Sequence, residues 1–179
     1  EPGEPIGALS EDSGLADLGG DGGVNILSSG RASAGSQIRL RGAGEPVVVD
    51  GPDASSSDGQ VSLTLDDRDV QDDSRRISWS GTGVLSVEGA PVALDENSIL
   101  QISYMVTGRG EGPVSFAMAC GEDCEGSIDV TAGIRWAESK DWQNAELPLS
   151  CFAEAGADLS AIPAPLVISG SPGLEIWLD

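Results

Sequence analysis

The segment "DDRDVQDDSRRISWSG" gathers the residues of the chain that are best suited to chemistry. It covers residues 66–81 and places five aspartates and three arginines ahead of Trp79. Carboxylate oxygens are the ligands that Ca²⁺ prefers, and a pair of carboxyl groups is the acid and base of most glycosidases. Opposite charges can also form ion pairs where a strand begins. The segment therefore raises three alternatives: a metal site, a catalytic pair, or an ion-paired strand entrance.

The first half of this segment offers candidate metal ligands. Asp66, Asp67 and Asp69 could bind a structural calcium ion together with carbonyl oxygens at the end of a strand. The segment lacks the D-x-D-x-D-G spacing and the glutamate at position twelve of an EF-hand loop. A structural calcium ion at these aspartates is one expectation, and a solvated acidic turn is the alternative.

The second half of the segment places two arginines side by side before a tryptophan. Adjacent residues of a strand point to opposite faces, so Arg75 and Arg76 cannot share a role. We predict that Asp72 or Asp73 pairs with one of them at the strand entrance, while the other arginine faces solvent or a ligand. Trp79 is four residues beyond Arg75 and lies on the same face, where we expect it to anchor the core.

Catalysis, nucleic-acid binding and a membrane span are not expected of this chain. Thirty acidic residues single out no carboxylate pair, and no histidine is present for a nucleophilic triad. A net charge of −21 repels nucleic acid and anionic lipid. No apolar stretch approaches the roughly 20 residues that cross a bilayer. With no leader sequence at its start, the chain is either a processed protein or a segment of a larger one.

Two of the three cysteines favour a disulfide and, with it, an oxidising compartment. Cys120 and Cys124 in "ACGEDCEG" do not have the CxxC spacing of zinc ribbons, and there is no histidine to complete a metal site. A local disulfide that closes a turn between two strands is the better interpretation, and it favours a secreted or periplasmic protein. We expect Cys151 to be a small buried hydrophobic residue.

Tryptophans beside polar side chains are candidates for binding carbohydrate. Trp136 and Trp142 flank a polar turn in "GIRWAESKDWQNAEL", and this turn contains Lys140. Exposed indoles stack on the apolar face of sugar rings, while nearby charged and amide groups bind the hydroxyls. Trp136, Arg135, Lys140, Trp142 and Arg76 are therefore the candidate carbohydrate-binding residues. Local packing is the alternative for Trp136, and a structural role at the start of "WQNAELPL" is the alternative for Trp142.

The elements that must position these residues are short antiparallel strands. Segments such as "QIRLR", "VSLTL" and "LEIWLD" alternate apolar and polar residues, and Gly, Pro, Asp or Ser separates one segment from the next. In "LEIWLD" the alternation sets Leu174 and Ile176 inward and Trp177 outward. More than ten such strands predict an all-β sandwich of the jelly-roll type. One short helix is expected in residues 151–162. We assign residues 24–179 to the sandwich and residues 1–23 to a linker or docking arm.

Several of these segments together resemble a known family. The runs "VQDDSRRISWSG", "AMACGEDCEGSIDVTAG" and "DWQNAELPLSCFAEAGADLSAIPAPLVISGSPGLEIWLD" are similar to the C-terminal domain of ExoP-type family-3 β-glucosidases and exo-β-1,3/1,4-glucanases. The likeness is strongest over residues 60–179. It implies a galactose-binding-like jelly roll that is similar in fold to carbohydrate-binding modules.

The resemblance also implies a function. In that family the catalytic carboxylates belong to preceding α/β domains, which this chain lacks. The expected role is therefore a non-catalytic accessory module that binds polysaccharide of the β-glucan type for a secreted enzyme. The alternative is a structural domain that supports the catalytic domains and has no affinity for glycan.

Overall fold

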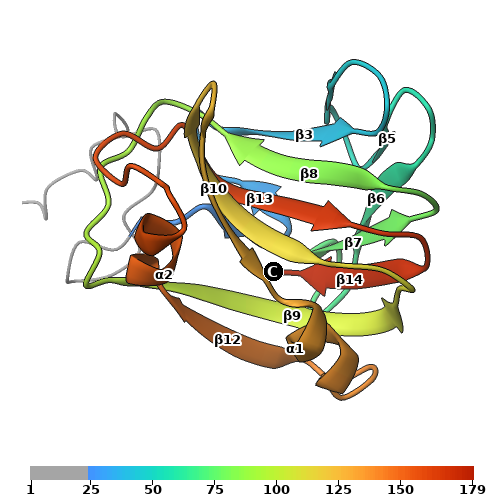
Figure 1. Ribbon diagram of the computed structural model, residues 1–179. Coiled ribbons are helices and arrows are strands. Elements are labelled where there is room, and N and C mark those ends of the chain that lie inside the picture. The colour runs from blue at the N-terminus through green and yellow to red at the C-terminus, as the bar shows by residue number, and fades with distance from the viewer. Residues whose placement is uncertain (1–23) are drawn as a thin grey trace, which may run out of the picture.

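Two antiparallel β-sheets packed face to face form the body of the molecule, as the alternating segments predict. The computed structural model describes residues 24–179, so the expected arm at residues 1–23 lies outside the described part. Figure 1 shows the two sheets as layers, with β3 and β8 in one and β9 and β12 in the other. The strands are β1 (Leu27–Ser28), β2 (Arg31–Ala32), β3 (Gln37–Arg41), β4 (Val47–Val48), β5 (Asp53–Ser55), β6 (Val61–Asp66), β7 (Ser74–Trp79), β8 (Gly83–Glu88), β9 (Ile99–Arg109), β10 (Ser115–Gly121), β11 (Cys124–Asp129), β12 (Gln143–Pro148), β13 (Ala164–Gly170) and β14 (Leu174–Leu178).

Each large sheet has six strands. One, here called the platform sheet, has the order β12-β9-β14-β7-β6-β5, and the other, the opposite sheet, has the order β11-β10-β13-β8-β3-β4. All pairings within them are antiparallel, and β1 and β2 form a separate hairpin. The two inner faces supply the hydrophobic core. The all-β sandwich expected from the sequence is confirmed.

Trp79 anchors the core between the two sheets, as predicted. It ends β7 in the platform sheet, is only 2% exposed, and donates a hydrogen bond from Nε1 to the carbonyl oxygen of Gly83 at 3.0 Å. Gly83 begins β8, so this bond joins one sheet to the other. A Cβ at Gly170 would lie 2.6 Å from a ring atom of Trp79, so glycine is needed there for the indole to fit.

Two short helices lie at opposite ends of the sandwich (Figure 1). Helix α2 (Leu149–Glu154) begins two residues before the predicted helical segment. It ends early because Gly156, with φ of 118°, cannot continue a helix. The expectation of a buried Cys151 is wrong: this thiol is exposed, and Leu149 and Phe152 fill the inward side of α2. Helix α1 (Thr131–Trp136) was not predicted.

The predicted disulfide is confirmed. Cys120 and Cys124 are joined at the hairpin between β10 and β11, on the edge of the opposite sheet.

The predicted ion pair between the aspartates and arginines of residues 72–76 is wrong. Arg75 is 6% exposed, and its guanidinium donates to the carbonyl oxygens of Gly30 and Pro52, each at 2.6 Å. Backbone carbonyls of the β1–β2 hairpin and of the segment before β5 thus take the place of the expected carboxylate. Gly30 has φ of 68°, and a Cβ there would overlap the backbone of Ser74, so the hairpin can approach only because this residue is glycine.

Candidate functional site

The outer face of the platform sheet carries hydroxyl, amide, carboxylate and guanidinium groups together with an indole. Alternation along the strands turns every second side chain outward. We call this surface the outer platform. Its members are Asp53, Ser55, Ser62, Thr64, Asp66, Arg76, Ser78, Gln101, Ser103, Met105, Thr107, Asn144, Glu146, Glu175 and Trp177.

One row of side chains crosses the middle of the outer platform. Strand register places Met105 opposite Trp177, Trp177 opposite Arg76, and Arg76 opposite Thr64. Directly opposed side chains on one face of antiparallel strands are in contact distance. The row therefore brings a thioether, an indole, a guanidinium and a hydroxyl together across four strands.

Hydrogen bonds hold the polar groups around Trp177 in place. The guanidinium carbon of Arg76 lies 5.5 Å from the centre of the Trp177 ring, and Trp177 Nε1 donates to Thr107 Oγ1 at 3.3 Å. Glu175 accepts from the hydroxyls of Thr107 at 2.6 Å and Ser78 at 2.7 Å. Burial alone would raise the pKa of Glu175, but these two hydrogen bonds and the charge of Arg76 hold it below its ordinary value. Glu175 is therefore an ionised acceptor at neutral pH.

A shallow depression lies on the outer platform beside this row. Its wall includes hydroxyls of Ser62, Thr64 and Ser78 together with Arg76 and Glu175. An indole with neighbouring hydroxyl, carboxylate and guanidinium groups can stack on one face of a sugar ring and exchange hydrogen bonds with its hydroxyls.

The segment between β6 and β7 borders the outer platform. The carboxylate of Asp73 accepts hydrogen bonds from the backbone N–H groups of Asp69 and Val70, each at 2.9 Å. Burial would raise the pKa of Asp73, and the hydrogen bonds from backbone N–H groups lower it. Arg68 then reaches out of this segment to Asp179 at 2.6 Å and lies 4.4 Å above the ring of Trp142. Asp73 and Arg68 thus order a loop.

The three candidate calcium ligands do not converge. Asp66 lies 3.5 Å from Arg76, Asp67 accepts from the backbone N–H of Asp72 at 2.8 Å, and Asp69 lies 3.5 Å from Arg68. Within residues 24–179 no three His, Cys, Asp or Glu side chains are grouped closely enough to hold a metal ion. Calcium at these aspartates stays a prediction, and it would require backbone carbonyl oxygens as further ligands.

The predicted carbohydrate-binding residues separate into two places. Arg76 belongs to the outer platform, and Trp142 lies at its β12 edge, directly before Gln143, whose strand partner is Tyr104. Trp136 and Arg135 lie instead on α1, beyond the end of β9. Lys140 is in the turn between the two places, with φ of 66°.

Sequence reasoning missed the indole at the centre of the outer platform. The alternation of "LEIWLD" turned Trp177 outward, and an outward tryptophan in a regular strand was the available signal. Glu175 carried no comparable signal, because it is one of 30 acidic residues. Thr107 is one of many hydroxyl residues in the strands, so it did not stand out either. Only the register of β14 with β9 and β7 shows which of them adjoin Trp177.

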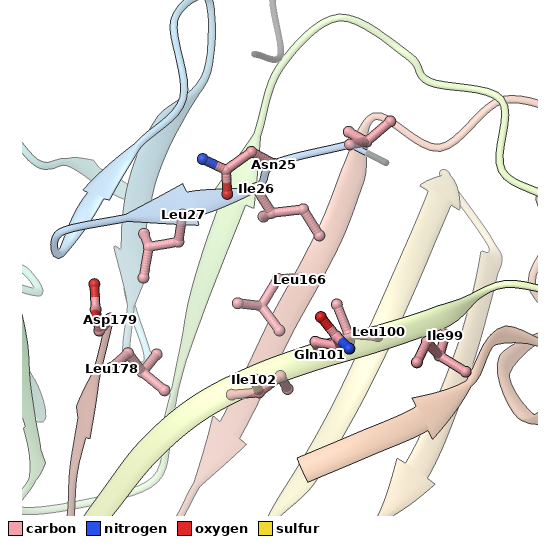
Figure 2. Close-up of a pocket in the computed structure, with 11 residues that line it drawn as sticks. Asn25, Ile26, Leu27, Ile99, Leu100, Gln101, Ile102, Leu166, Leu178 and Asp179 are labelled. Atoms are coloured by element: carbon pink, nitrogen blue, oxygen red, sulfur yellow. The ribbon is translucent and has the colours of Figure 1, made fainter. Parts of the chain in front are cut away.

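A second hollow is different in character. A cavity of about 370 Å³ lies between the start of β9, β13 and the segment before β1. Figure 2 shows the side chains that line it. Its walls are mostly aliphatic, with Ile26, Leu27, Leu100 and Leu166 pointing into it. We call it the aliphatic groove. It has no aromatic side chain, so it lacks the stacking surface of the outer platform.

Among the described residues, no helix is sufficiently long and apolar to span a bilayer.

Solved structures with a similar fold include a domain of a glucanase. The extra C-terminal domain (X) of exo-1,3/1,4-β-glucanase ExoP from a Pseudoalteromonas species matches with a TM-score of 0.72 and 20% identity, over 86% of this chain and 87% of that domain. The whole ExoP enzyme matches with a TM-score of 0.70 and 20% identity, over 86% of this chain and 19% of the enzyme.

A carbohydrate-binding module has the same fold. The family 30 module of the cellulosomal cellulase Cel9D-Cel44B of Clostridium thermocellum matches with a TM-score of 0.54 and 14% identity, over 86% of this chain and 93% of that module. No sequence among the curated proteins matches.

A family model settles the relationship. The model of the family Exop_C, described as galactose-binding domain-like, matches residues 37–179. The match covers most of the chain and includes every strand of the platform sheet. The resemblance read from the sequence is therefore confirmed, and the protein belongs to the Exop_C family of galactose-binding-like domains.

Proposed function

We propose that this domain binds polysaccharide on its outer platform and acts as a non-catalytic accessory module of a family-3 glycoside hydrolase. The row Met105–Trp177–Arg76–Thr64 carries the proposal, because it joins a stacking surface to several hydrogen-bonding groups. The fold shared with the ExoP domain and the family 30 module supports the same role.

The charge state of Glu175 fits a role without catalysis. A glycosidase requires one carboxyl group whose pKa is raised so that it can donate a proton. Hydrogen bonds from Thr107 and Ser78 lower the pKa of Glu175 against the effect of burial, so this group on the outer platform is a poor proton donor. We infer that the catalytic domains are partners of this domain.

The proposed ligand is a neutral β-glucan. Carboxylates such as Glu175 and Asp66 repel acidic polysaccharide and accept hydrogen bonds from sugar hydroxyls. The strands present their outward side chains in a row across the sheet, which suits an extended chain. The disulfide between Cys120 and Cys124 supports a secreted or periplasmic location.

A supporting domain without glycan affinity is the second candidate function. The aliphatic groove favours it, because Val24 and Ile99, two of the exposed large hydrophobic residues, are among the residues that line it. Contiguous apolar surface of this kind often marks contact with another domain.

Affinity gel electrophoresis of the 179-residue chain separates the two candidates. Native gels would contain laminarin, mixed-linkage β-glucan, xylan or soluble cellulose, with bovine serum albumin as the unretarded standard. Retardation in a β-glucan gel supports the accessory module. If migration is unchanged in all four gels, the domain has no affinity for these glycans and the supporting role is the remaining candidate. Turnover of nitrophenyl glycosides by the chain alone would contradict a non-catalytic role.

A further inference from the structure

An almost fully exposed tryptophan stands at the end of the sandwich, away from the outer platform. Trp136 is 87% exposed, the largest exposed fraction among the large hydrophobic residues of the described chain. It lines a depression with Glu111, Pro113, Asp129, Thr131 and Arg135, here called the tip depression. The tip depression shares no lining residue with the depression on the outer platform. Figure 1 shows α1, which bears Trp136, at the opposite end of the sandwich from α2.

The backbone that carries Trp136 is held firmly. Ile134 and Ala137, on either side of it, are each 4% exposed and belong to the core. Arg109 at the end of β9 donates from Nη2 to the carbonyl oxygen of Ala137 at 2.9 Å. The indole is therefore displayed in solvent from a fixed position. A side chain on a fixed backbone loses little conformational freedom when it binds a ligand, which favours affinity.

The walls of the tip depression are fixed by hydrogen bonds as well. Thr131 Oγ1 accepts from the backbone N–H of Val114 at 2.9 Å, which joins α1 to the segment before β10. Asp129 Oδ1 accepts from the backbone N–H of Thr131 at 2.8 Å. Hydrogen bonds from Thr131 are the main cause of a lowered pKa at Asp129, so this group is an ionised acceptor at neutral pH.

We propose that the tip depression is a second glycan site, which takes a single neutral sugar ring at the end of a chain. Trp136 would stack on the ring, and Asp129, Glu111 and Arg135 would bind its hydroxyls. The lining comes from the loop after β9, the end of β11 and α1, and it includes a single aromatic side chain. One indole stacks on one sugar ring, so we assign the site to one ring. The inference shares only its ligand class with the proposed function.

The surroundings of Trp136 favour sugar over a protein partner. A protein interface usually has an apolar centre. None of the four exposed large aliphatic residues of the described chain lines the tip depression, and two of them, Val24 and Ile99, line the aliphatic groove instead. The indole of Trp136 instead has charged side chains as neighbours. Glu111 and Asp129 repel uronic acids, so the ring is neutral.

Two sites on one domain make binding bivalent. The outer platform would hold the body of a chain, and the tip depression would hold an end of the same or another chain. A second contact raises retention by increasing the local concentration of ligand, without a change in either site.

Titration of the ¹⁵N-labelled 179-residue chain with laminaribiose tests the tip depression directly. The probe is a disaccharide, which is short enough to occupy a single-ring site. We expect the indole N–H signal of Trp136 to shift saturably, with a dissociation constant of roughly millimolar size. Trp136→Ala should weaken this binding at least tenfold, Trp136→Phe should weaken it less because a ring remains, and Trp177→Ala should leave it within twofold. Val48→Ala removes another exposed hydrophobic side chain and is the matched control.

The outcomes separate this inference from the proposed function. If laminaribiose shifts only signals of the outer platform and Trp136→Ala binds normally, the second site is wrong and the proposed function stands. If Trp136→Ala loses the disaccharide while Trp177→Ala binds laminarin normally, the tip depression stands and the outer platform is wrong. Normal binding of every glycan by Trp136→Ala, together with loss of binding to the catalytic domains, would overturn the inference in favour of a protein contact.

Discussion

The outer faces of the two sheets differ in what they expose at equivalent places. The middle row of the platform sheet holds Met105, Trp177 and Arg76. The corresponding row of the opposite sheet runs from Arg39 through Ser86 and Val167 to Ala117. It includes a guanidinium but no aromatic side chain. One face therefore offers an indole that can stack on a sugar ring, and the corresponding row of the other face offers none.

The difference shows that the sandwich itself does not determine binding. Inward positions of both sheets are constrained by packing and hold similar aliphatic residues. Outward positions are free of that constraint, so their residue types reflect function or solubility. We therefore expect substitutions on the outer platform to change glycan binding, and substitutions on the outer face of the opposite sheet to leave it unchanged. Substitutions in the shared core should affect both faces alike.

The largest effect is expected from Trp79→Ala, which removes the side chain shared by both sheets. Loss of a buried tryptophan should lower the free energy of unfolding by about 3–5 kcal/mol. Urea denaturation followed by circular dichroism measures this change. Glycan binding by the fraction that remains folded should be unchanged. A variant that unfolds normally but no longer binds β-glucan would place Trp79 in the binding site and contradict its assignment to the core.

Loss of the disulfide should have a smaller effect on stability and should spare the outer platform. The loop that joins Cys120 and Cys124 is short, so the double replacement by serine should lower the free energy of unfolding by about 2 kcal/mol. The bond lies on the edge of the opposite sheet, and migration in β-glucan gels should match that of the unmodified chain. If the double serine variant is fully folded but is retarded less in the β-glucan gel, the two faces are coupled.

Trp177→Ala should separate the two faces most clearly in binding. We expect at least a tenfold loss of affinity for laminarin, about 1.4 kcal/mol, by isothermal titration calorimetry. Trp177→Phe keeps a ring but loses the bond to Thr107, and it should bind with intermediate affinity. Ser86→Ala on the opposite sheet is the control and should bind as the unmodified chain does. Equal losses in Trp177→Ala and Ser86→Ala would remove the distinction between the faces.

The smallest effect concerns acid stability and Glu175. Its pKa in the folded protein is below the ordinary value of 4.5, so its contribution to stability is full above that pH and is lost as the pH falls through the lower, folded value. Glu175→Gln should therefore be less stable than the unmodified chain at pH 7 and equally stable at strongly acidic pH. The difference should be about 0.5 kcal/mol or less, because solvent screens the group. Melting temperatures between pH 7 and pH 2 measure it, and a difference that grows in acid would refute the assigned direction.

The strands were predictable because their residue pattern and burial follow the same period. "SRRISW" became β7 with Arg75, Ile77 and Trp79 on one face, as alternation requires. Helix α1 was missed because only Ile134 of its six residues is buried, which leaves no helical period to detect.

The partners of charged side chains were not predictable. Arg75 binds backbone carbonyls from segments that are distant in the sequence, and Asp73 binds backbone N–H groups of its own loop. Carbonyl and N–H groups occur at almost every residue, so the sequence does not indicate which are near. The side chains that adjoin Trp177 come from other strands, so only the strand register shows which they are.

An NMR titration of the ¹⁵N-labelled chain with a mixed-linkage gluco-oligosaccharide of six sugars tests the central claim most directly. If the outer platform binds glycan, the indole N–H of Trp177 and backbone amides in β7, β9 and β14 should shift saturably. We expect this because these strands carry the row around Trp177. No comparable shifts are expected in β3, β8 and β13. Shifts confined to the opposite sheet or to the aliphatic groove, or no shift at any ligand concentration, would contradict that claim.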